Sequence, residues 1–120
     1  MAHLDLAGDE LILHLGLFER IGGFVHGDAR IPLANVRSAR AVDDPWGELR
    51  GERSPGINLL RRLALGTWRF PGGKDFVALR GKGRGVVVHL MGVEFQRLVV
   101  SSENADEWAA EIDRLAFRPT

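Results

Sequence analysis

The side chains best suited to bind a ligand in this 120-residue chain are four arginines, Arg50, Arg53, Arg61 and Arg62. A guanidinium group pairs bidentately with a phosphate or a carboxylate, so a basic loop at this point predicts contact with an anionic group. The alternative is a solvated loop whose arginines pair with acidic neighbours such as Glu48. Exposed pairs of that kind are common and contribute little free energy, so both interpretations stay open.

The formal net charge of the chain is zero, but the charges are unevenly distributed. More than half of the basic residues, including both lysines, lie between residues 50 and 84. Trp68 and Phe70 would supply stacking faces if this stretch bound single-stranded nucleic acid. The aromatic residues also fit core positions, and an isoelectric point near 6.9 is low for that class of protein. A nucleic-acid partner is therefore disfavoured.

The remaining motifs carry no recognisable catalytic or metal chemistry. The glycine-rich run at residues 81–85 lacks the hydroxyl of a phosphate-binding loop, and is expected as the tip of a hairpin. Asp43 and Asp44 precede Pro45 and predict a turn rather than an acid–base pair. The chain has no cysteine, and the spacing of its histidines does not suggest a metal site: His3, His14, His26 and His89. We therefore expect no enzyme activity, no metal site and no cofactor.

The elements that position these residues are expected to be mainly strands. Seven short segments have the apolar alternation or the β-branched content of strands: residues 10–17, 28–33, 33–44, 63–70, 74–80, 86–91 and 95–101. Residues 33–44 also fit a helical spacing, but the alternation from Val36 to Val42 favours a strand. Pro32 lacks an N–H donor, so it belongs near the edge or the end of a sheet.

Two segments break the strand pattern. Residues 45–62 contain several prolines and glycines and predict one long loop, a kind of connection that is often functional. Phe18, Ile21 and Val25 recur at helical spacing, but the glycines among them limit this segment to a turn or two.

The clearest element is a C-terminal helix over residues 104–116. Asn104 is expected to cap its N-terminus, and Glu107 completes the pattern of a capping box. Trp108, Ile112 and Leu115 lie on one apolar stripe. A helix this short is marginal alone in water, so the stripe is expected to pack against the strands.

Composition predicts a single cytoplasmic domain over residues 1–120. Hydrophobic residues make up 45% of the chain and charged residues 27%, which is ordinary for a soluble globular protein. Acidic residues among the first ten positions argue against a signal peptide. No apolar run approaches the roughly 18 residues that a membrane helix requires.

Several segments resemble the small bacterial pleckstrin-homology-like (PH-like) domain proteins, over roughly residues 9–116. They are residues 31–38, 43–46, 65–68, 73–78 and 95–101. The resemblance implies a seven-stranded barrel of two near-orthogonal antiparallel sheets, with the C-terminal helix capping one end. It also implies a docking platform for phosphoinositides, peptides or proteins. Residues 10–30 offer only Arg20 and Arg30 as basic side chains, so inositol-phosphate recognition of the usual kind is disfavoured.

The function expected is that of a non-catalytic interaction module. It would bind a protein or peptide partner, or a second copy of itself, through an exposed sheet edge or through residues 45–62. The alternative is an anionic small molecule or a lipid head group bound by Arg50, Arg53, Arg61 and Arg62.

Overall fold

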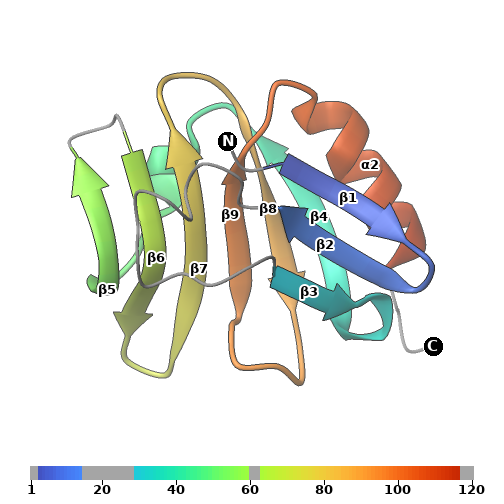
Figure 1. Cartoon of the computed structure of the whole chain (residues 1–120), viewed down its shortest axis with the longest axis horizontal. Helices are drawn as coiled ribbons and strands as arrows, with labels where there is room; N and C mark the ends of the chain where they lie inside the picture. The colour runs from blue at the N-terminus through green and yellow to red at the C-terminus, as the bar shows by residue number, and fades with distance from the viewer. Residues whose placement is uncertain (1–2, 15–28, 60–62, 117–120) are drawn as a thin grey trace.

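The computed structural model describes residues 3–14, 29–59 and 63–116, which form two sheets and one C-terminal helix (Figure 1). The three-stranded sheet has the order β1-β2-β3, and the six-stranded sheet has the order β4-β8-β9-β7-β6-β5. The bounds are β1 His3–Ala7, β2 Glu10–His14, β3 Ala29–Pro32, β4 Val36–Val42, β5 Glu52–Leu59, β6 Leu63–Phe70, β7 Gly73–Arg80, β8 Gly85–Leu90, β9 Arg97–Ser101 and α2 Ala105–Leu115. Two 3₁₀ turns, η1 (Leu33–Asn35) and η2 (Pro45–Glu48), flank β4.

The six-stranded sheet contains one parallel pair, β7 with β9. Strand β9 pairs with β8 on its other side, so it lies between β7 and β8. The glycine-rich run at residues 81–85 therefore connects two strands that are not neighbours, and the expectation of a hairpin tip is wrong. Ser102 N–H donates to the carbonyl of Arg84 at 3.0 Å, which ties this connection to the end of β9.

The large core lies between one face of the six-stranded sheet and a second layer made of the three-stranded sheet and α2. Leu11 and Leu13 of β2 and Ile112 of α2 are fully buried in it. They meet alternate residues of the large sheet, such as Val86 and Val88. Strands alternate their faces, so Val87 between them must lie on the opposite side.

A small core lies on that opposite face of the six-stranded sheet. Val77, Val87 and Val99, from the three central strands, are fully buried there, and Trp46 and Leu49 pack against them. The central strands are therefore apolar on both faces, which is why residues 86–88 form a continuous apolar run rather than an alternating one.

The mainly β fold with a C-terminal helix is confirmed, but the barrel is not. Within the described residues the two sheets do not close on each other, and the β7–β9 pair is parallel. Helix α2 packs across β4 and β8, beside the three-stranded sheet, instead of plugging the end of a barrel (Figure 1).

The helix itself agrees with the prediction in its bounds and differs at its cap. Asn104 occupies the N-cap position, but its side chain makes no capping hydrogen bond. The acidic residues Asp106 and Glu107 lie in the first turn, where they interact favourably with the helix dipole.

Residues 45–62 are not one irregular loop. They contain η2 and the eight-residue strand β5, which runs antiparallel to β6. Pro55 and Gly56 lie in this strand, where the register with β6 shifts between Arg53 and Gly56. A proline fits there because β5 is the edge strand of its sheet, and edge strands and bulges tolerate a missing N–H donor.

Of the remaining elements, some were predicted correctly, one was not predicted, and one lies outside the described residues. The strand predicted within residues 33–44 is confirmed as β4, preceded by η1. Pro32 is the last residue of β3, an edge strand, as expected. Strand β1 was not predicted. The turn proposed around Phe18–Val25 lies outside the described residues.

Candidate functional site

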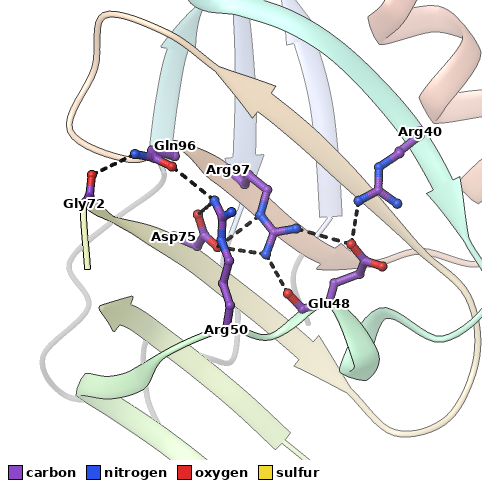
Figure 2. A network of polar contacts seen from close by, with 7 residues as sticks. All are labelled: Arg40, Glu48, Arg50, Gly72, Asp75, Gln96 and Arg97. Carbon is purple, nitrogen blue, oxygen red and sulfur yellow. Dashed lines mark hydrogen bonds and ion pairs between the residues drawn. The ribbon is translucent and has the colours of Figure 1, made fainter. Parts of the chain in front are cut away.

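A cluster of charged and polar side chains crosses the small-core face of the six-stranded sheet (Figure 2). We call it the Asp75 cluster; it consists of Arg40, Glu48, Arg50, Asp75, Gln96 and Arg97. Its centre is the pair Asp75 and Arg97, which are 1% and 6% exposed. These two residues are direct partners in the β7–β9 register, so their side chains leave the sheet on the same face.

Arg97 joins the sheet to η2. Its Nε and Nη2 atoms donate to Asp75 Oδ2 at 3.0 and 2.9 Å. Nη2 also donates to the backbone carbonyl of Glu48 at 2.5 Å, and Nη1 donates to Glu48 Oε1 at 3.2 Å. One buried guanidinium group therefore holds a strand carboxylate, a turn carbonyl and a turn carboxylate together.

Arg50 holds the same carboxylate from the other side. Its Nε donates to Asp75 Oδ2 at 2.7 Å and its Nη2 to Asp75 Oδ1 at 3.0 Å, which is a bidentate pair. Its guanidinium also lies 4.1 Å from the centre of the Phe70 ring. The hydrogen bond to Asp75 raises the pKa of Arg50 above its ordinary value. Arg50 is therefore fixed in the structure rather than free in a loop.

Glu48 connects the buried pair to the surface. Arg40 Nη2 donates to Glu48 Oε1 at 2.5 Å, and Arg40 Nε donates to Nε2 of His89 at 3.4 Å. The hydrogen bond from Arg40, followed by the charges of Arg40 and Arg97, lowers the pKa of Glu48. Glu48 is therefore ionised at neutral pH, and it accepts from one buried and one half-exposed arginine.

The cluster is an arrangement for holding charge rather than for moving protons. Every buried side-chain nitrogen and oxygen atom of the described residues has a hydrogen-bond partner. Asp75 accepts hydrogen bonds from two guanidinium groups, those of Arg50 and Arg97. The three arginines Arg40, Arg50 and Arg97 face two carboxylates, so the cluster carries one net positive charge.

The structure brings one of the four predicted arginines to this cluster. Arg50 is a member, and it pairs with Asp75 rather than with a sequence neighbour. Arg53 lies on β5 with its Cα opposite Trp68, and its side chain is outside what the structure describes. Arg61 and Arg62 lie outside the described residues. Sequence reasoning missed Asp75 and Arg97; each is a charged residue directly before an apolar run, a position that exposed turn residues also occupy.

The two edges of the six-stranded sheet differ. At the β4 edge, the backbone N–H of Ala39 donates to Oδ1 of Asp113 on α2 at 3.2 Å, so the helix occupies that edge. At the opposite edge, no strand of the described residues pairs with the outer side of β5. An open strand edge presents main-chain donors and acceptors to any extended chain that reaches it.

Two hollows are lined by residues outside the Asp75 cluster. The one beside η2 has a volume of about 270 Å³ and is lined by Asp43, Asp44, Trp46, Gly81, Lys82 and Gly83. The other, of about 280 Å³, is lined by Arg30, Ile31, Phe76, Val93, Glu94, Phe95 and Leu98. Neither lining includes a serine, threonine or histidine. In the described part of the chain, no group of acidic residues and histidines is arranged to hold a metal ion.

Comparison with known proteins adds no assignment. No family model, no curated protein and no solved structure matches this chain. Among the described residues, no helix combines the length and the apolar character needed to cross a membrane. Any assignment of function to this chain therefore rests on its own geometry.

Proposed function

We propose that this protein is a non-catalytic docking module that binds an extended segment of a partner protein along the outer edge of β5. The observation that carries this proposal is the position of β5: it is the terminal strand of the six-stranded sheet, and no described strand pairs with its outer side. The opposite terminal strand, β4, has Asp113 of α2 against its edge.

Strand addition requires little from side chains. The partner's main chain supplies the hydrogen bonds, and pockets for alternate side chains add specificity. Pro55 removes one N–H donor from β5, so the longest stretch of β5 without a proline is Gly56–Leu59. A short stretch of this kind suits a reversible contact with a specific segment, whereas a long, uninterrupted edge invites aggregation.

The proposal includes a PH-like fold and a cytoplasmic location, both of which suit a docking module. A PH-like protein would be a docking platform, and a cytoplasmic module of this size would act by bringing a partner to another component. Self-association is the special case in which the partner segment is β5 of a second copy, related by a two-fold axis.

The test begins with a selection of random peptides displayed on phage against the intact protein. Hydrogen–deuterium exchange of the complex then locates the contact. Strand addition predicts slower exchange of amides within residues 52–59 and unchanged exchange within residues 36–42. Protection centred on β4, or on neither edge, would contradict the proposal.

Two proline variants sharpen this test. Successive residues of a strand direct their N–H groups to opposite edges, so Ile57→Pro and Asn58→Pro differ in which edge they affect. One removes a hydrogen bond to β6 and destabilises the sheet, and the other removes an outward donor. The variant that keeps the wild-type thermal midpoint is expected to lose peptide binding at least tenfold. Unchanged binding by that variant would rule out the β5 edge.

A further inference from the structure

We propose that the Arg40 side of the Asp75 cluster is a binding site for a carboxylate group, and that Glu48 is an internal occupant which an acidic side chain of a partner displaces. This site lies on the small-core face of the sheet. It is separate from the β5 edge, because Arg40 belongs to β4, at the opposite end of the strand order.

The first support is the distribution of hydrogen bonds within the cluster. Asp75 uses both oxygens to accept from Arg50 and Arg97. Glu48 uses one oxygen, Oε1, to accept from both Arg40 and Arg97. Glu48 therefore does not form the bidentate pair with Arg40 that a free carboxylate can form. A partner's carboxylate, unlike Glu48, is not held at a fixed distance by η2.

The second support is the exposure and rigidity of the arginines. The side chain of Arg40 is 46% exposed, and its Nη1 atom donates to none of the described residues. Arg97 is buried and is held by Asp75, so its guanidinium is already oriented. A ligand that joins an oriented arginine loses less side-chain entropy than one that must order it.

The third support is the positive potential at this point of the surface. His89 lies beside Arg40 and accepts its Nε–H. Burial, followed by the charges of Arg40, Arg97 and Arg50, lowers the pKa of His89, and the opposing effect of Asp75 is smaller. Glu48 on η2 is paired with two of these arginines, Arg40 and Arg97. The net positive charge that disfavours protonation of His89 is the charge that a bound anion would neutralise.

The experiment uses His89 as the reporter and formate as the probe. Formate is a small carboxylate that stays ionised through the titration range of histidine. The pKa of His89 is measured by NMR in sodium formate and in sodium chloride at the same ionic strength. An anion that binds tenfold more tightly once His89 is protonated raises this pKa by about one pH unit at saturation. We expect a rise in formate, and a larger rise in Glu48→Gln, where the internal carboxylate is gone.

Two further variants assign the effect to Arg40. Arg40→Gln removes the guanidinium and is expected to abolish the response to formate. Arg37→Gln removes the same charge from an exposed position of the same strand, and is expected to keep the response. Each variant is first compared with the wild type by its amide spectrum, to show that it is folded.

Two outcomes would overturn the proposal. One is a His89 pKa that is equal in formate and chloride, both in the wild type and in Glu48→Gln. The other is a response to inorganic phosphate without a response to formate, which would make the ligand a phosphate rather than a carboxylate. Peptide binding at the β5 edge is measured separately, so either proposal can fail without the other.

Discussion

At the scale of single residues, Asp75 determines how η2 attaches to the sheet. A carboxylate that is 1% exposed loses most of its hydration, which costs several kcal/mol unless it is paired and hydrogen-bonded. Arg50 and Arg97 supply that compensation through four hydrogen bonds. An apolar residue of similar volume would avoid the cost altogether. The charged pair instead fixes the position of η2 relative to the sheet, because the arginine that binds Asp75 also donates to the backbone carbonyl of Glu48.

Asp75→Asn is therefore expected to be among the most destabilising conservative substitutions in this protein. The amide keeps the volume but leaves the buried guanidinium of Arg97 without its main counter-charge. Removing one partner of a buried ion pair typically costs about 3–5 kcal/mol of the free energy of unfolding. Urea denaturation, followed by circular dichroism, measures this cost.

Asp43→Asn is the matched control. Asp43 also pairs with an arginine, Arg84 at 2.9 Å, but its side chain is 93% exposed. An exposed pair contributes about 0–1 kcal/mol, so this variant is expected to unfold at nearly the wild-type urea concentration. If Asp75→Asn and Asp43→Asn cost the same, the Asp75 cluster does not hold η2 in the way described.

At the scale of elements, Gly51 controls how the chain passes from η2 into β5. Its φ angle is +78°, in the left-handed region that favours glycine. A Cβ atom added there would lie 1.9 Å from the backbone carbonyl oxygen of Arg69. A backbone atom of a neighbouring strand cannot move away without disturbing the β5–β6 pairing. Gly51 therefore determines where β5 begins. It also sets the backbone position from which the Arg50 side chain reaches Asp75.

Gly51→Ala is expected to destabilise the protein more than Gly72→Ala. Gly72 also has a positive φ, +97°, but a Cβ atom added there would meet nothing within 4 Å. The backbone conformation alone costs about 1–2 kcal/mol, which Gly72→Ala should show. Gly51→Ala adds a steric overlap to that cost. Thermal unfolding compares the two variants, and equal midpoints would show that β5 adapts to a side chain at position 51.

The elements that the sequence pattern predicted are those with uninterrupted local signals. Strands β2 to β4 and β6 to β9 show apolar runs, alternation or β-branched residues, and α2 shows a clear apolar stripe with an acidic first turn. Strand β5 was mistaken for a loop because Pro55 and Gly56 are usually strand breakers. They are tolerated here because β5 is an edge strand with a shift in register.

The Asp75 cluster could not be predicted in the same way, because it depends on which strands become neighbours. Arg97 lies beside Asp75 only because β9 pairs in parallel with β7. The glycine-rich run at residues 81–85 instead suggested that β7 and β8 form a hairpin, which would leave no place for β9 between them. The basic stretch pointed to Arg50, but nothing local to Asp75 distinguishes it from an exposed turn residue.

At the scale of the whole molecule, the two cores are not separate units. Val86 and Val88 belong to the large core and Val87, between them, belongs to the small core. The same alternation links Phe76 with Val77, and Leu98 with Val99. A local opening that removes one core must therefore distort the strands that build the other. Small domains built on one shared sheet typically unfold in a single cooperative step.

This coupling predicts that probes on the two faces of the sheet report one transition. Trp108 lies on α2 beside the large core, and Trp46 lies on η2 against the small core. One variant keeps only Trp108 (Trp46→Phe with Trp68→Phe), and the other keeps only Trp46 (Trp68→Phe with Trp108→Phe). Within each variant, tryptophan fluorescence and far-ultraviolet circular dichroism are expected to give the same urea midpoint. The comparison is made inside each variant, so the stability lost through the substitutions does not enter it.

If the Trp46 signal changed at a lower urea concentration than the dichroism, η2 would detach before the sheet unfolds. The contacts of the Asp75 cluster with η2 would then open locally, before the cooperative unfolding of the sheet.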